Sequence, residues 1–129
     1  MCLSRSKIHW RELFEIMLAI NQSVIMVLGM SLPATFKSDK TEYLDARSSY
    51  RNICQQSEVS RAAAVELRQT RFEAHKRMIE TAENLLMSVQ GLHRSHLSAL
   101  GLWEMYQELT AGNGSPVVLL KLADETAKL

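Results

Sequence analysis

The sequence predicts an all-α protein, and three observations lead to this fold class. Apolar residues recur at steps of three and four, as they do on one face of a helix. Glycine and proline are scarce, with five and two residues among 129. No segment alternates apolar and polar residues as a half-buried strand does. We therefore expect one helical domain, built either as a bundle or as an elongated hairpin with one long helix around residues 40–90.

The first expected element is an apolar helix over residues 1–32. The stretch from Ile16 to Phe36 carries no charge. It is therefore long enough to cross a bilayer, which takes about 20 residues. Asn21 and its two polar neighbours interrupt the stretch, and buried amides are costly in lipid. A buried core helix is the first interpretation. A membrane-embedded helix over residues 16–32, or a targeting segment, is the alternative.

A polar linker is expected over residues 33–39, followed by the long helix. Asp39 and Glu42 have the spacing of a capping box, which predicts that the helix begins at about residue 40. Residues 40–90 contain no glycine and no proline. One helix of this length would measure about 75 Å, longer than a compact domain of this size. Either this helix breaks near residues 57–60 or the protein is elongated.

Two further helices are expected near the C-terminal end of the chain. Gly91 is a natural end point for the long helix, so the next helix is predicted over residues 92–110. Ser115 followed by Pro116 has the pattern of an N-cap with proline at the first helical position. This pattern predicts a last helix over residues 116–128.

A thin apolar seam with nearly seven-residue spacing runs along the expected long helix. Such a seam is typical of a helix that packs on a partner helix. We therefore expect a protein partner, through self-association or a place in a larger complex. The predicted partner-binding residues are Tyr50, Ile53, Cys54, Ala64, Leu67 and Phe72.

The charge balance bears on other partners. The net charge is +1, which argues against general nucleic-acid binding, because that needs many uncompensated cations. Glutamates alternate with the basic residues of the long helix, as on a solvated helix face. A membrane-associated protein whose basic side chains contact an anionic surface is the alternative. The residues concerned are Arg61, Arg68, Arg71, Lys76 and Arg77.

Signatures of catalysis are missing from the sequence. It contains no glycine-rich phosphate loop, no nucleophile elbow and no paired-histidine zinc motif. We therefore predict a non-enzymatic protein with no cofactor, no metal site and no catalytic residue. Its two cysteines, Cys2 and Cys54, do not form a disulfide framework, which indicates a reducing compartment and a cytoplasmic location. Membrane association is the alternative location.

Arg68 and His75 are seven residues apart, so a helix would place them on nearly one face. This spacing resembles the Arg-x(4–6)-His motif of the HEPN ribonucleases, which are small all-helical proteins. That resemblance implies an RNA-cleaving dimer in which Arg68 and His75 meet at the dimer cleft. Gln69 stands where the family usually has Asn, Asp or His.

Residues 58–109 resemble the last long helix of BAR domains, especially those of sorting nexins. The resemblance rests on the segment from Arg71 to Lys76 (RFEAHK) and on the segment from Leu102 to Tyr106 (LWEMY). It implies an elongated dimeric coiled coil that senses or shapes membranes. The chain is shorter than a whole BAR domain, and Gly91 and Gly101 interrupt the segment.

Overall fold

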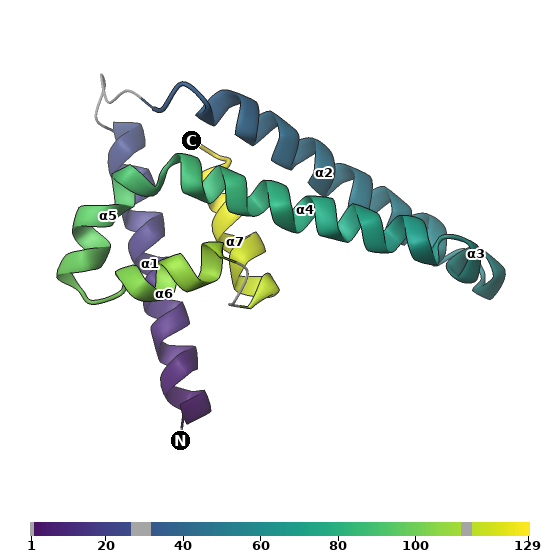
Figure 1. The fold of residues 1–129 in the computed structure, drawn as a ribbon, viewed down its shortest axis with the longest axis horizontal. Coiled ribbons are helices and arrows are strands. Elements are labelled where there is room, and N and C mark those ends of the chain that lie inside the picture. The colour runs from purple at the N-terminus through teal and green to yellow at the C-terminus, as the bar shows by residue number, and fades with distance from the viewer. Residues whose placement is uncertain (1, 27–31, 112–114) are drawn as a thin grey trace.

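The computed structural model describes residues 2–26, 32–111 and 115–129, and the regular structure in these ranges is entirely helical. The predicted all-α fold is confirmed. Figure 1 shows how the helices are arranged. They are α1 (Cys2–Met26), α2 (Phe36–Ser57), α3 (Arg61–Glu66), α4 (Arg68–Ser88), α5 (Gln90–Ala99), α6 (Trp103–Thr110) and α7 (Pro116–Thr126).

Two long helices, α2 and α4, run antiparallel and form an arm with α3 at its tip (Figure 1). The inner part of α4, at the base of the arm, joins α1, α5, α6 and α7 in a bundle. Within this bundle α7 contacts both α4 and α1, and α5 contacts α1 and α6. The protein thus combines both expected architectures, because a bundle and a helical hairpin share α4.

The hydrophobic core lies at the base of the arm. The inner half of α4 supplies Met78, Ala82, Leu85 and Leu86, whose spacing of three and four residues keeps them on one buried face. These side chains pack with buried residues from α1, α2, α5, α6 and α7. The larger members from those helices are Leu13, Met17, Phe36, Tyr43, Leu97, Tyr106, Leu109, Leu119 and Leu122.

The outer part of the arm has almost no core. From Arg47 to Arg77, Ser57 is the single buried residue. The two outer helices therefore contact each other along a narrow seam and present their remaining surface to solvent. Large apolar side chains are part of that surface: Val59 is 80% exposed, Val65 58% and Phe72 64%.

The stretch 40–90 is not one continuous helix, so the unbroken alternative is wrong. The chain reverses at residues 58–60, inside the region expected for a break. The Glu58 amide donates to the carbonyls of Cys54 and Gln55 and ends α2, and the Ser60 side chain accepts from the Ala63 amide at 3.0 Å. Ser60 is thus the N-cap of α3, since its oxygen satisfies an amide without a helical partner. The helix pair gains contacts that a rod would lack.

The expected linker 33–39 is too long, because α2 begins at Phe36. Phe36 is 5% exposed, and the helix extends to bury its ring in the core. The Asp39 amide donates to the carbonyl of Thr35, which is the N-cap and makes no side-chain capping bond. Asp39 is therefore in the first turn, where its negative charge favours the helix dipole, and the capping-box prediction is wrong.

Gly101, rather than Gly91, marks a helix end. Gly91 lies inside α5, and the helix expected over 92–110 is divided into α5 and α6. Gly101 has φ +73°, its amide donates to Ser98 at 3.1 Å, and the Leu102 amide donates to Leu97 at 2.8 Å. These two bonds form a Schellman motif, which favours glycine because a Cβ is strained at positive φ.

Helix α1 contributes its apolar face to the bundle. Leu13, Met17 and Ile20 are buried there, and α1 contacts α7 and α5. Residues 27–31 of the apolar helix expected over 1–32 lie outside the described residues. Among the described helices, none has the length and apolar character that a membrane crossing requires.

Candidate binding groove on the helical arm

The predicted partner-binding residues all lie on the outer part of the arm. Tyr50, Ile53 and Cys54 are on α2, and the other three lie on α3, at its end, or on α4. All are half-buried except Phe72. The first partner of the α2 seam is therefore α4 of the same chain, because the hairpin folds back on itself. Phe72 remains as an exposed aromatic side chain.

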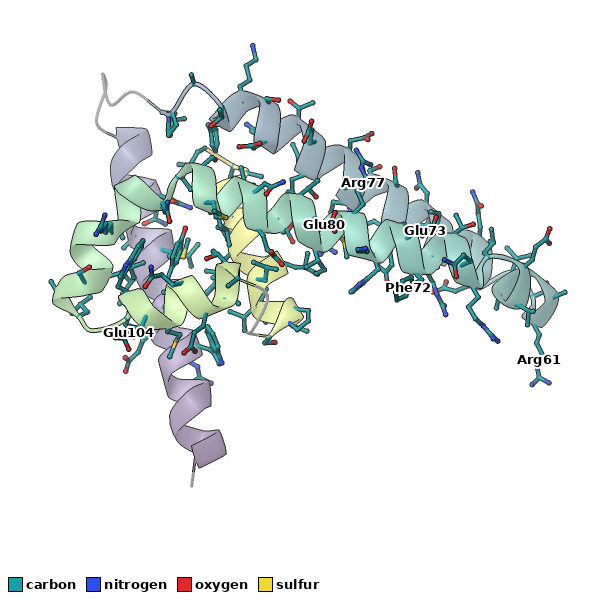
Figure 2. All side chains as sticks on the ribbon, in the orientation of Figure 1. Arg61, Phe72, Glu73, Arg77, Glu80 and Glu104 are labelled. Carbon is teal, nitrogen blue, oxygen red and sulfur yellow. The ribbon has the colours of Figure 1, made fainter. Side chains whose placement is uncertain are left out.

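An open groove of about 330 Å³ lies on this part of the arm. Helix α4 supplies most of its lining, because side chains three and four residues apart share a helix face. Figure 2 shows Phe72 pointing away from the helix into solvent. The lining residues are Tyr50 from α2 and Arg68, Arg71, Phe72 and His75 from α4.

Tyr50 joins the two helices across the groove. Its ring meets the His75 ring edge to face, with centroids 5.3 Å apart and an interplanar angle of 67°. Such aromatic pairs fix the relative orientation of both rings. A hydrogen bond with the Cys54 side chain, followed by burial, raises the pKa of the Tyr50 hydroxyl, and the positive charge of Arg71 opposes this shift. The hydroxyl is therefore neutral at physiological pH.

The groove is lined by cations without a carboxylate. Two other arginines of the arm are paired: Arg77 contacts Asp45 at 3.1 Å, and Arg47 contacts Asp124 at 3.2 Å. Within the described residues, neither Arg68 nor Arg71 forms an ion pair. Two guanidinium groups and an imidazole thus surround a space that can accept an anion.

The five basic residues predicted for an anionic surface do not share one face. Phe72 marks the side of α4 that lines the groove. Arg77 is five positions further on, or about 140° around the helix, and Figure 2 shows it on a different side of α4 from Phe72. Arg61 lies at the tip, on α3. Arg68 and Arg71 line the groove, whereas Arg77 is held by Asp45.

A polar cluster at the base of the arm was missed by the sequence reasoning. The Tyr43 hydroxyl donates to the Asp124 carboxylate, and the Arg47 guanidinium contacts both Asp124 and the sulfur of Met78, at 3.2 and 3.3 Å. Burial, with the hydrogen bond to Asp124, raises the pKa of Tyr43 well above its usual value. The cluster attaches α7 to both helices of the arm. Only an alignment of homologues could pair residues so distant in sequence.

A second hollow of about 400 Å³ lies between α1 and α7, and it too was not predicted. Trp10, Phe14 and Val118 supply apolar lining, with Arg11 and Lys121 at the same site. No group of three or more potential metal-ligating side chains occurs among the described residues. The groove on the arm, by contrast, places two guanidinium groups beside the aromatic ring of Phe72, an arrangement that suits an anion.

Comparison of the chain with protein-family models, curated proteins and solved structures gives no match.

Proposed function

We propose that this protein is a non-enzymatic helical assembly module whose arm packs on the arm of a second copy of the chain. The observation that carries this proposal is the combination of a nearly coreless outer arm with the exposed apolar side chains Val59, Val65 and Phe72. Burial of apolar surface is the main driving force for association. A four-helix contact between two arms would supply the core that each arm lacks.

The charges of the arm are compatible with self-association. Over residues 58–80 the chain carries five basic and four acidic residues, so two copies would meet without strong repulsion. The two signs alternate along the chain, which allows complementary pairs across a two-fold interface. A partner of opposite net charge is therefore not required.

Sedimentation of the intact chain at low micromolar concentration tests the proposal. We expect a concentration-dependent dimer or larger oligomer, and Phe72→Asp should convert it to a monomer because a carboxylate would be buried without a partner. Val117→Asp is a matched control, since Val117 is similarly exposed, at 61%, but lies on α7. A monomer at every concentration, or equal loss of assembly in both variants, would contradict the proposal. Leu67→Asp is expected to act as Phe72→Asp does.

A second candidate is an RNA-cleaving dimer of the HEPN type. Arg68 and His75 line the same groove, which is the observation that supports it. In such a dimer, a second copy of the chain would place its own Arg68 and His75 opposite those of the first copy. Incubation of the protein with RNA beside the His75→Ala variant tests the candidate. Equal cleavage by both proteins would remove it.

A further inference from the structure

We propose that the groove on the outer arm binds a phosphotyrosine side chain of a partner protein. One face of α4 supplies the guanidinium groups of Arg68 and Arg71 and the imidazole of His75. The aromatic rings of Tyr50 and Phe72 line the same groove. A phosphate ester has three acceptor oxygens and a charge near −2, and arginine binds it through two parallel hydrogen bonds. The inference rests on the proposed function in one respect, namely that the arm is a contact surface. Because Phe72 belongs to both surfaces, the phosphotyrosine would occupy the groove of an unassembled chain and compete with the second copy.

The two arginines of the groove are available to an anion, because neither is held in an ion pair in the part of the chain that the structure describes. Arg47 and Arg77, on the same arm, already contact aspartates, so their charges are compensated. Within the described residues, Arg68 and Arg71 have no such contact. An incoming phosphate would therefore meet cations that need not first release a carboxylate of this chain. At Arg77, by contrast, the phosphate would have to displace the Asp45 carboxylate, which would cost binding free energy.

The aromatic lining specifies what carries the phosphate. Phe72 is 64% exposed, and Tyr50 is fixed edge to face against His75. A flat ring attached to the phosphate can pack on Phe72, which would remove apolar surface from water on both sides. An aliphatic phosphoserine would leave Phe72 uncovered. In a phosphotyrosine the phosphate is carried on the ring itself, and the groove offers both an exposed aromatic ring and two guanidinium groups.

The charge pattern favours a single phosphorylated side chain over a nucleic-acid strand or a membrane. A strand binds through several phosphates along a continuous basic track. On this arm Glu66 lies two residues before Arg68, Glu73 follows Phe72, and the net charge over residues 58–80 is only +1. The groove therefore offers one anion site, and the nearly balanced charge of the arm gives further phosphates no continuous basic track.

Amide chemical-shift titration of the intact ¹⁵N-labelled chain tests the inference, with the peptide Ala-phosphoTyr-Ala as the probe. Sedimentation of the same samples, with and without peptide, follows assembly, so binding and assembly are measured separately. We expect saturable shifts centred on the groove residues. Arg68→Gln and Arg71→Gln should each weaken binding about tenfold, because each removes a charged hydrogen bond.

Matched controls decide between outcomes. Arg77→Gln, which removes a cation held by Asp45, should leave the affinity unchanged, and Ala-Tyr-Ala should bind at least about tenfold more weakly. Absence of saturation, or equal binding by Arg68→Gln and Arg77→Gln, would overturn the inference. Tighter binding of adenosine monophosphate than of the phosphopeptide would assign the groove to a nucleotide instead and would also overturn it. Self-association without peptide binding would leave the proposed function intact.

Discussion

The Tyr43 hydroxyl donates a hydrogen bond to the Asp124 carboxylate, which connects the base of the arm to the last helix of the bundle. The same carboxylate contacts Arg47 at 3.2 Å. One acidic side chain on α7 thus contacts two side chains one turn apart on α2. The orientation of the arm relative to the bundle depends on this contact and on the apolar packing between α4 and α7.

Asp124→Ala should lower the free energy of unfolding by about 1–2 kcal/mol, because it leaves Tyr43 and the partly buried Arg47 without their acceptor. Urea denaturation measures the change. Glu125→Ala is the control, since Glu125 pairs with the exposed Lys128 and such pairs contribute little. An equal loss in both variants would show that the cluster adds nothing specific.

Alkaline pH should destabilise the fold, and the buried Tyr43 and Tyr106 should contribute most of the effect. Burial raises the pKa of Tyr106, whose hydroxyl donates to the Leu86 carbonyl at 2.6 Å, and burial with the Asp124 bond raises that of Tyr43. Above a pH of about 10 the unfolded chain loses tyrosine protons that the folded chain keeps, so stability falls as pH rises. The double variant Tyr43→Phe, Tyr106→Phe should be less stable at pH 7 and should have a flatter profile. Thermal unfolding between pH 8 and 11 checks this, and an unchanged slope would contradict it.

The two described glycines should respond to alanine in opposite directions. Gly101→Ala should cost about 1 kcal/mol or more, because its φ of +73° is strained for a residue with a Cβ. Gly91→Ala should be neutral or stabilise by about 0.4–1 kcal/mol, since Gly91 lies in α5 and a Cβ there would meet nothing within 4 Å. Melting temperatures compare the pair. A loss in Gly91→Ala as large as that in Gly101→Ala would contradict the helix boundaries.

Truncation at the two ends of α4 should have unequal effects on folding. Leu85→Ala should cost about 2–5 kcal/mol, because Leu85 is fully buried and its removal leaves a cavity. Phe72→Ala should change the monomer's stability by no more than about 0.5 kcal/mol, since most of its side chain is already in solvent. Denaturation at a concentration that keeps the chain monomeric measures both. A large loss of stability in Phe72→Ala would mean that the ring packs against other residues of the monomer.

Local patterns predicted the helical class. The buried residues Met78, Ala82, Leu85 and Leu86 follow the same spacing of three and four, which can be seen without any knowledge of distant contacts. The reversal at residues 58–60 was left open, since Ser60 can cap a new helix or continue an old one. The early start of α2 was missed because burial of Phe36 outweighs the capping preference of Asp39.

Contacts between residues far apart in the chain could not be predicted from one sequence. The residues of the groove were partly identified, since Arg68, Arg71, Phe72 and His75 fall on one helix with suitable spacing. Their grouping with Tyr50 depends on the hairpin, which sequence spacing does not define. The link between Tyr43 and Asp124 likewise joins elements that are far apart in the chain. No local propensity distinguishes these partners from other acids and tyrosines.

Helix α4 is a single continuous rod of 21 residues, about 31 Å long, whose outer turns carry Phe72 and whose inner turns carry Leu85. A stiff rod of this kind acts as a lever. Any molecule that grips its free end would apply a torque at the buried end, where tightly packed side chains resist it. Twisting or tilting of the arm would therefore strain the packing between α4 and α7, so this contact would act as the pivot of the arm.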